Sequence, residues 1–361
     1  MPISRLVVDK LRNIDHLELD AGSGVNLIVG ANGSGKTSLL EALYLLGRGR
    51  SFKTSKHKTF ITKGELQTTI FGEVQTLPDM APISAGITKN FDGLHQIKVA
   101  GVNATSAAPL LELMPIQLIE PETFKLLAAG PAYRRQFIDW GVFHVEHSFF
   151  ECWQRLNRCL KQRNKLLRRG KIDRSVLSVW DQEFVVQAER LTKQRAAYVE
   201  QLRPFFDDFL AALIDIKDLQ VEFYPGWNLK VSLEDTLNEM LISDSKRGFT
   251  QAGPHRADLR VKYLEHNASD ILSRGQQKLV ICALKIAQGH YFSQTTGRPC
   301  IYLLDDLAAE LDGVHRDRLC QMLSTLNCQL FITSVDESAF SNNWPSMDVK
   351  VFHVEHGKLV S

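Results

Sequence analysis

Hydrophobic and polar positions change their period along the chain. Leu6 to Asp20 and Glu65 to Val102 contain short runs that alternate between apolar and polar residues, which is typical of half-buried strands. Turn residues separate the later runs: Pro78, Pro82 and the Asp92-Gly93 pair. From about Pro121 the spacing becomes helical. The pattern therefore predicts an antiparallel sheet near the N-terminus, followed by a helical lobe.

Within the helical stretch, apolar residues recur at steps of three and four in two segments on either side of Gly170. The first segment carries Phe149, Trp153, Leu156 and Leu160, and the second carries Leu177, Trp180, Phe184, Ala188, Leu191, Tyr198 and Leu202. Two helices joined by a short polar connection predict an antiparallel helical hairpin.

Two further apolar runs lead directly into residues that can bind anions or metal ions. Val25 to Val29 is a strand-type run before a glycine-rich segment, and Ser38 to Leu46 has helical composition. Ile301 to Leu304 is a second strand-type run, and it ends in Asp305 and Asp306. Strands followed by helices in this way indicate an α/β fold.

The glycine-rich segment from Gly30 to Thr37 reads GANGSGKT and fits the phosphate-binding pattern G-x-x-x-x-G-K-[ST]. In that pattern, backbone N–H groups and a helix N-terminus surround phosphate oxygens, Lys36 reaches the β- and γ-phosphates, and Thr37 offers a hydroxyl to Mg²⁺. The expected nucleotide contacts are Gly30, Ala31, Asn32, Gly33, Ser34, Gly35, Lys36 and Thr37. The sequence thus predicts binding of ATP with Mg²⁺, and the strand and helix around the segment disfavour a turn that binds nothing.

The two carboxylates after Ile301 to Leu304 stand where α/β sheets place their ligand chemistry, at the carboxyl end of a strand. We assign Asp305 to Mg²⁺, directly or through water. We assign Asp306 to orienting or deprotonating the attacking water, so that Asp306 and Lys36 are the catalytic candidates. The alternative is that two acidic residues merely end a buried strand.

A second anion-binding segment is predicted at Ser273, Arg274, Gly275 and Gln276, because they precede a helical stretch from Leu279 to Gln288. One nucleotide does not need two such segments in one subunit. Two subunits arranged head to tail would each lend Ser273, Gly275 and Gln276 to the other's γ-phosphate, through an isologous interface. An ordinary serine N-cap is the alternative for these four residues.

Together these segments resemble the ABC-type ATPase heads of Rad50 and SMC proteins, because a Walker A loop, an SxGQ signature, a Walker B strand and Ala309-Glu310-Leu311-Asp312 follow in that order. Along essentially its whole length, the chain is similar to the RecF family of bacterial DNA replication and recombinational repair proteins. The more particular segments are LRNI (Leu11 to Ile14), GPAYRRQFID (Gly130 to Asp139), GPHRADL (Gly253 to Leu259) and SRGQQK from Ser273.

This resemblance implies an ABC-type P-loop head with an inserted helical lobe. The expected divisions are 1–118 for the N-terminal half of the head, 119–248 for the helical lobe with its hairpin, and 249–361 for the C-terminal half. It also implies an ATP-dependent homodimer that clamps double-stranded and gapped DNA, acts with RecR and RecO in RecA loading, and takes part in the SOS response. Arg12 and Asn13 are placed near the nucleotide by the same resemblance.

Two departures from transporter heads favour slow hydrolysis, in a weak DNA-stimulated ATPase that acts as a switch. The signature has Arg274 where such heads usually carry glycine, so the backbone approaches phosphate less freely. Thr333-Ser334-Val335 follows the strand Gln329 to Ile332 without a histidine. A transporter ATPase subunit and an SMC-like structural tether remain the alternatives; the first would need a membrane partner, and the second would need a hinge and long heptad arms.

Composition narrows the class of protein. A chain of 361 residues with 44% hydrophobic residues can bury more than one core. No apolar run reaches membrane-spanning length and no signal-like N-terminus is visible, so a soluble, cytoplasmic protein without a membrane partner is expected. The six cysteines form no C-x-x-C pair and are expected to be reduced. A net charge of only +2 means that any nucleic-acid surface must be a local patch.

A basic cluster lies on the first helix of the hairpin and just beyond it: Arg155, Arg158, Lys161, Arg163, Lys165, Arg168, Arg169, Lys171 and Arg174. Clustered Arg and Lys bind the DNA backbone without reading sequence, and Lys161, Arg168 and Arg169 are our main candidates. A solvated helix face is the alternative.

Two other basic pairs, Arg134 with Arg135 and His255 with Arg256, serve DNA, the dimer interface or internal ion pairs with Asp139 and Asp258. The motif Phe-His-Val-Glu-His occurs at Phe143 and again at Phe352, but its spacing differs from that of the helical zinc motif, and we interpret the repetition as coincidence.

Overall fold

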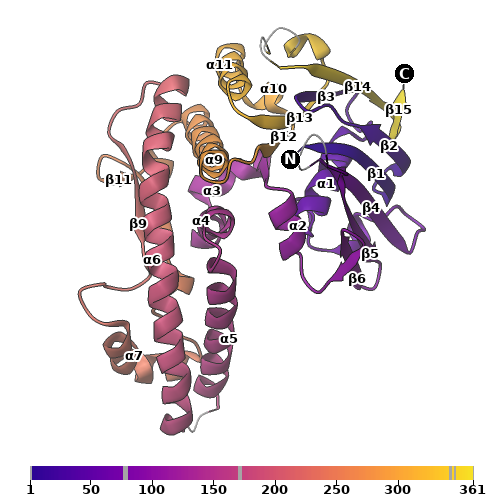
Figure 1. Cartoon of the computed structure of the whole chain (residues 1–361). Coiled ribbons are helices and arrows are strands. Elements are labelled where there is room, and N and C mark those ends of the chain that lie inside the picture. The colour runs from indigo at the N-terminus through magenta and orange to yellow at the C-terminus, as the bar shows by residue number, and fades with distance from the viewer. Residues whose placement is uncertain (1, 76–79, 170–172, 341–343, 345–346, 361) are drawn as a thin grey trace. The chain divides into compact units, whose positions relative to one another are not determined.

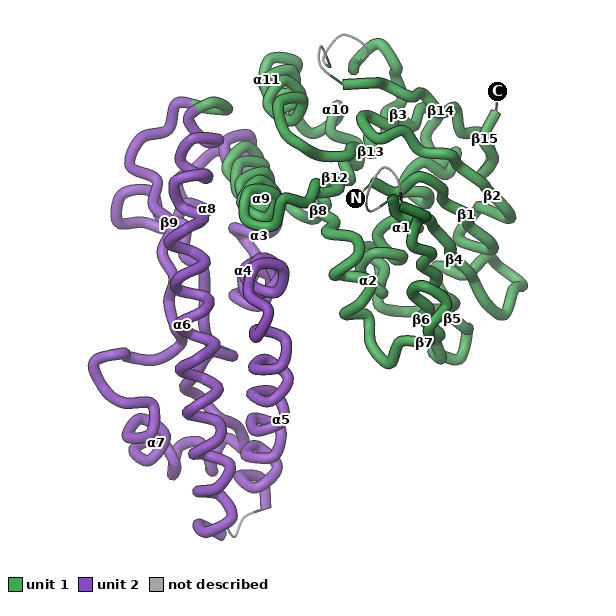
Figure 2. Tube along the Cα trace, viewed as in Figure 1, with its two compact units in different colours: residues 1–124, 212–214, 278–361 green, residues 125–211, 215–277 purple. Residues whose placement is uncertain are grey.

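The computed structural model describes residues 2–75, 80–169, 173–340, 344 and 347–360, and the chain divides into two compact units (Figure 2). Unit 1 contains residues 1–124, 212–214 and 278–361, and unit 2 contains residues 125–211 and 215–277. Pro78, Gly170 and Lys171 lie outside the described residues.

The antiparallel sheet predicted from the N-terminal alternation is present in unit 1, with strand order β2-β1-β4-β5-β6-β7. Its strands are β1 (Ile3–Leu11), β2 (Ile14–Asp20), β4 (Gln67–Val74), β5 (Ile83–Asn90), β6 (His95–Val99) and β7 (Val102–Ala104). Alternate residues of β4 are buried, because one face of the sheet covers a core while the other faces outward.

A second sheet of unit 1 has the order β15-β14-β3-β13-β12-β8. Its strands are β3 (Val25–Val29), β8 (Ile116–Ile119), β12 (Cys300–Leu304), β13 (Cys328–Ser334), β14 (Val349–Glu355) and β15 (Lys358–Val360). All neighbouring strands run parallel except β15, which is antiparallel to β14. Strands β3, β12 and β13 are buried along their whole length, which explains their continuous apolar runs.

Helix α1 (Lys36–Arg48) packs against strands of both sheets. It shares one core with β1, β4, β8 and β12. A Cβ on Gly47 would lie 2.4 Å from Cδ1 of Ile116, so only glycine lets α1 approach β8 this closely. The remaining elements of unit 1 are η1 (His57–Thr59), α2 (Ala108–Leu113), η2 (Pro121–Phe124), α10 (Leu307–Glu310), α11 (Gly313–Ser324) and η4 (Glu337–Ala339).

In unit 2, helices α5 (Phe149–Leu167) and α6 (Arg174–Leu213) form the expected antiparallel hairpin (Figure 1). Beside them lie α3 (Lys125–Ala128), α4 (Pro131–Val145), α7 (Leu233–Arg247), η3 (Pro254–Arg256), α8 (Ala268–Ile271) and a small sheet of β9 (Leu219–Tyr224), β10 (Asp258–Tyr263) and β11 (His266–Asn267). Helix α9 (Arg274–Thr296) begins in unit 2 and continues in unit 1.

The buried face of α5 differs from the prediction, because Trp153 is exposed and Cys152 and Cys159 occupy the buried positions instead. The same helical spacing places Arg163 on the buried face. Its guanidinium is fully buried and donates to Asp181 at 2.8 Å and to Asp244 at 2.7 Å. The assignment of Arg163 to an exposed basic cluster was therefore wrong.

Candidate functional site

The segment Gly30 to Thr37 forms a turn between β3 and the start of α1, as predicted. Gly33 and Gly35 have positive φ angles of 79° and 118°, a conformation that favours glycine. A Cβ on Gly30 would lie 2.3 Å from the backbone oxygen of Val354, so no side chain fits there. The turn thus has the backbone that lets successive N–H groups face one ligand.

Lys36 folds over this turn and is buried, although it carries a charge. Its Nζ donates to the backbone oxygens of Gly30 at 2.7 Å and Ala31 at 2.9 Å. Burial lowers the pKa of Lys36, whereas Asp306 and Asp305 act in the opposite direction. The amine is thereby held next to the turn and within the electrostatic range of both carboxylates.

Asp305 joins the turn to the parallel sheet. Its Oδ1 accepts hydrogen bonds from Thr37 Oγ1 at 3.0 Å and from Thr333 Oγ1 at 2.8 Å. Burial raises the pKa of Asp305, while the two hydroxyls lower it. The motif residues Thr37 and Asp305 are far apart in sequence, yet they share a direct contact within unit 1.

Asp306 lines a cavity of about 400 Å³ together with Lys36 and Thr37. Its backbone has a positive φ of 51°, and its N–H donates to Thr333 Oγ1 at 3.0 Å. The hydroxyl of Thr333 therefore positions both acidic residues. Sequence reasoning missed this role, and the signal available was a hydroxyl at the carboxyl end of the neighbouring strand β13.

Glu120 is a second residue that sequence reasoning missed. It follows β8, whose last residue accepts the backbone N–H of Asp305, so the two carboxylates end adjacent strands. Burial, with a smaller contribution from Asp305, raises the pKa of Glu120 to about 7. The sequence signal was an acidic residue directly after the apolar run Ile116–Ile119.

These residues fit a nucleotide triphosphate with a divalent cation. Hydroxyl and carboxylate oxygens from Thr37, Asp305 and Asp306 are the hard donors that Mg²⁺ prefers. In addition, Ser34 Oγ is buried in the turn without a hydrogen-bond partner among the described residues. A phosphate oxygen would satisfy this hydroxyl.

Of the two residues that the resemblance places near the nucleotide, Asn13 lies beside the turn. Asn13 Nδ2 donates to the backbone oxygen of Gly33 at 3.3 Å, and its side chain lines the same cavity. Arg12 contacts Glu41 at 2.8 Å, and it also donates to the backbone oxygen of Thr59. Arg12 thus braces the β1–β2 turn, and Asn13 is the member of this pair that reaches the cavity.

The segment Ser273 to Gln276 caps the N-terminus of α9. Gln276 N donates to Ser273 Oγ at 3.3 Å, and Ser273 N donates to Gln276 Oε1 at 2.9 Å, which is a reciprocal capping box. Ser273, Arg274 and Gly275 are exposed. The capping alternative is therefore realised, and it leaves the exposed helix N-terminus able to face an anion.

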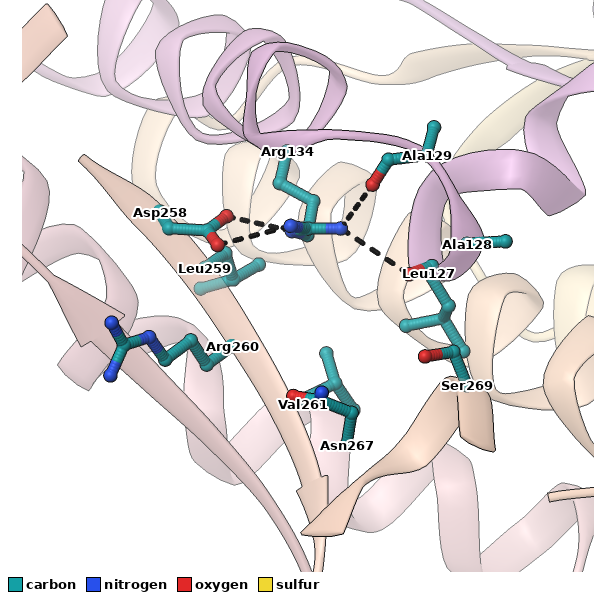
Figure 3. Close-up of a pocket in the computed structure, with 10 residues that line it drawn as sticks. All are labelled: Leu127, Ala128, Ala129, Arg134, Asp258, Leu259, Arg260, Val261, Asn267 and Ser269. Carbon is teal, nitrogen blue, oxygen red and sulfur yellow. Dashed lines mark hydrogen bonds and ion pairs between the residues drawn. The ribbon is translucent and has the colours of Figure 1, made fainter. Parts of the chain in front are cut away.

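The candidate DNA-contacting residues fall into two groups. Lys161 on α5 is exposed, as are Arg168 and Arg169 directly after its last residue, although Arg168 Nε donates to the backbone oxygen of Gly248. Arg134 instead forms a two-bond pair with Asp258, at 2.7 and 3.0 Å, beside a pocket of about 210 Å³ in unit 2 (Figure 3).

The other basic residues of this region are held by internal contacts. Arg135 donates to the backbone oxygen of Ala257 at 2.8 Å. Asp139 pairs with Arg195 at 2.7 Å and not with its neighbours in sequence. Burial lowers the pKa of His255 to about 4. Asp258, which was expected to pair with its sequence neighbours, instead pairs with Arg134 of α4.

The repeated Phe-His-Val-Glu-His motif occupies two different environments. Its first copy begins in α4 of unit 2, whereas the second lies on β14 and in the turn after it. His353 and His356 of the second copy line a cavity of about 390 Å³ next to Gly30 to Ser34. The second copy is therefore part of the surroundings of the phosphate-binding turn.

Comparisons with known proteins show the family to which the chain belongs. The family model "RecF/RecN/SMC N terminal domain" matches residues 2–359. The DNA replication and repair protein RecF of Pseudomonas paraeruginosa (strain DSM 24068 / PA7) is 45% identical, over 99% of this chain and 97% of that protein. RecF of Stutzerimonas stutzeri (strain A1501) is 46% identical over the same shares.

Solved structures give the same picture. A structure of the recombination mediator protein RecF-ATP in the RecFOR pathway has a TM-score of 0.86 at 28% identity, and it covers 99% of this chain and 96% of its own. An Smc head bound to the C-terminal winged-helix domain of ScpA, at a TM-score of 0.58 and 16% identity over 100% and 98%, shares the fold. The fold is therefore that of an ABC-type ATPase head, and the chain belongs to the RecF family of DNA replication and repair proteins.

Proposed function

We propose that this protein is an ATP-operated DNA clamp of replication and recombinational repair. The observation that carries the proposal is the hydrogen bond between Thr37 and Asp305, which joins the phosphate-binding turn to the carboxylate strand in one partly buried cluster. Such a cluster is suited to a triphosphate with its cation. Membership of the RecF family supplies the setting of DNA repair.

The nucleotide is held by Gly30 to Thr37, with Lys36 next to the β- and γ-phosphates. Thr37 and Asp305 hold Mg²⁺, which neutralises phosphate charge when it is bound. Asp306, positioned through its backbone N–H by Thr333, orients the attacking water and accepts its proton. In this structure Lys36 donates to backbone oxygens of the turn and lies within the electrostatic range of both carboxylates. In the proposed complex, phosphate oxygens replace the backbone oxygens as the partners of Lys36.

The signature residues Ser273, Gly275 and Gln276 act on the nucleotide of a second copy. Their segment is exposed at the start of a 23-residue helix whose N-terminus attracts anions. A γ-phosphate between two copies would bridge them, so the homodimer forms with ATP and opens after hydrolysis. Because hydrolysis is slow, the lifetime of bound ATP sets how long the homodimer stays on DNA.

Further partners follow from the family. A structural relative is the recombination mediator RecF-ATP in the RecFOR pathway, and we propose RecO and RecR as partners of this chain at gapped DNA, where RecA is loaded and the SOS response begins. The exposed residues Lys161, Arg168 and Arg169 contact the DNA backbone. Among the residues that the structure describes, no helix is long and apolar enough to cross a membrane.

Gel filtration with and without ATP, followed by DNA binding under both conditions, tests this proposal. ATP-dependent dimerisation with ATP-dependent DNA retention is the expected result. Lys36→Ala should abolish nucleotide binding and dimerisation, whereas Asp306→Asn should bind ATP and stay dimeric. Co-purification with membranes and no DNA affinity would instead favour a transporter subunit, and wild-type turnover by Asp306→Asn would exclude the role of Asp306.

A further inference from the structure

A group of basic side chains without carboxylate partners among the described residues lies at one end of the antiparallel sheet, away from the signature and the carboxylate strand in sequence. Lys89, near the end of β5, is only 5% exposed. Neither a hydrogen bond nor an ion pair of its amine is found among the described residues. Burial lowers the pKa of Lys89, and no carboxylate offsets this effect. A buried amine in such surroundings is a candidate for binding an anion.

Two histidines flank this lysine. His95 is paired with Lys89 across β5 and β6 and therefore lies on the same face of the sheet. His57, on η1, has a buried Nδ1 that has no hydrogen-bond partner within the described residues. A Cβ on Gly93 would lie 3.9 Å from this Nδ1, which places it against the β5–β6 turn. Burial, and then Lys89 and His95, lower the pKa of His57, whereas the backbone of Asn90 acts in the opposite direction.

Two acids at this end of the sheet have other partners among the described residues. Asp92 accepts the backbone N–H of Leu94 at 3.1 Å and so stabilises the turn itself. Glu65 pairs with Lys10 at 3.1 Å. The polar neighbour Thr68, opposite Lys89 on β4, donates its hydroxyl to the backbone oxygen of Asp9. The amine of Lys89 is therefore left for an external anion, and the imidazoles of His57 and His95 lie next to it.

Exposed apolar side chains adjoin these basic residues. Leu66 is 79% exposed and Leu94 is 65% exposed. Backbone hydrogen bonds link Phe91 to both of them. The Phe91 N–H donates to the backbone oxygen of Leu66, and the N–H of the preceding residue, Asn90, donates to that of Leu94. Lys58 Nζ lies 4.5 Å from the centre of the Phe91 ring, so a further exposed cation adjoins the apolar residues. We call Lys89, His57, His95, Leu66, Phe91 and Leu94 the sheet-end site.

We propose that the sheet-end site binds an acidic segment of a partner protein, with one carboxylate on Lys89 and His57 and a large apolar side chain on Phe91 and Leu94. Charge complementarity selects an anion, and the apolar border selects a peptide. A DNA backbone suits this surface less well, since duplex binding uses exposed and solvated Lys and Arg. A side-chain carboxylate is also slimmer than a phosphodiester between two sugars, and it can reach a recessed amine.

Fluorescence anisotropy of the full-length protein tests the proposal, with a labelled peptide of about ten residues, the length of one extended binding strand, rich in Asp and Leu. A peptide with Lys in place of Asp is the control probe. Lys89→Met should weaken binding of the acidic peptide by about tenfold or more, since a hydrogen bond to a charged group is lost. Phe91→Ala should weaken it as well. The matched control is Lys98→Met, an exposed lysine on β6 that should leave binding unchanged.

The methionine side chain is similar in length to that of lysine, and the substitution removes a buried charge, so Lys89→Met should keep the wild-type melting temperature. It should also keep the wild-type ATP affinity. This retention separates the sheet-end site from the nucleotide site. Equal affinity of wild type and Lys89→Met for the acidic peptide would overturn the proposal. So would a loss of duplex DNA binding in Lys89→Met with peptide binding intact, or inorganic phosphate binding as tightly as the peptide.

Discussion

Thr333 provides the sharpest test of the nucleotide site, because one hydroxyl holds two acidic residues. It donates to Asp305 Oδ1 at 2.8 Å and accepts from Asp306 N at 3.0 Å. Replacement by the isosteric valine removes both contacts and leaves a backbone N–H unsatisfied. Hydrogen bonds to charged groups contribute about 1.5–3 kcal/mol. The Mg²⁺-dependent part of ATP affinity should therefore fall by about ten- to a hundredfold, the usual effect of losing a residue that orients a metal ligand.

Titration with a fluorescent ATP analogue, with and without Mg²⁺, measures this effect. Thr333→Ser keeps the hydroxyl and should behave like wild type, and urea unfolding of both variants shows whether the fold is retained. Unchanged affinity of Thr333→Val in Mg²⁺ would refute the positioning role. An equal loss with and without Mg²⁺ would show that the phosphate-binding turn has collapsed, and it would also refute the role.

Three further variants test the internal ion pairs and the buried histidine. Arg163→Met should lower the free energy of unfolding by about 3–5 kcal/mol in urea titrations, since it leaves the buried Asp244 without its charge partner; a shift below 1 kcal/mol would contradict the buried pair. Arg134→Gln should reduce the melting temperature more than the DNA affinity, because Asp258 occupies its guanidinium; the reverse order would show a direct DNA contact. His255 has a pKa lowered to about 4, so between about pH 6.5 and 4 the unfolded chain binds a proton that the folded chain does not. The free energy of unfolding should therefore decrease as the pH is lowered through this window, by at most about 3 kcal/mol. His255→Gln should flatten this pH dependence, and an unchanged slope in the variant would contradict the role of His255.

The local sequence pattern predicted the nucleotide-binding loop, because the strand, the glycines and the helix that form this loop are adjacent in the sequence. The strand Val25–Val29, the glycines at positive φ and the helix after Lys36 follow one another along the chain. The carboxylate strand could be predicted for the same reason. The motifs assigned Thr37 and Asp305 to one Mg²⁺, and the two side chains are in contact. The role of Thr333 could not be predicted, because only the pairing of β12 with β13 brings its hydroxyl to Asp305.

The hairpin shows the limit of periodicity in another way. A helix buries residues within an arc, and apolar residues at steps of three and four fix that arc only to within about one residue. On α5 the buried arc contains Cys152, Cys159 and Arg163. The prediction was shifted by one residue because it counted Trp153, which is exposed, as buried. A charged residue can hold a buried position when partners come from distant segments, as Asp181 and Asp244 do for Arg163. Those partners cannot be predicted from the spacing of residues along α5 alone.

Gly275→Ala separates the signature's effect on a partner from its effect on this chain. A Cβ on Gly275 meets no other atom of the described residues within 4 Å, and alanine favours a helix more than glycine does. The capping box of Ser273 and Gln276 does not involve the Gly275 N–H, which has no intrahelical acceptor in the first turn and can face a phosphate. Folding and ATP binding by the monomer should therefore be unchanged. If the segment acts on the nucleotide of a second copy, the added methyl group should abolish ATP-dependent dimerisation in gel filtration. A Gly275→Ala protein that still dimerises with ATP would show that the capping box is the whole role of the segment.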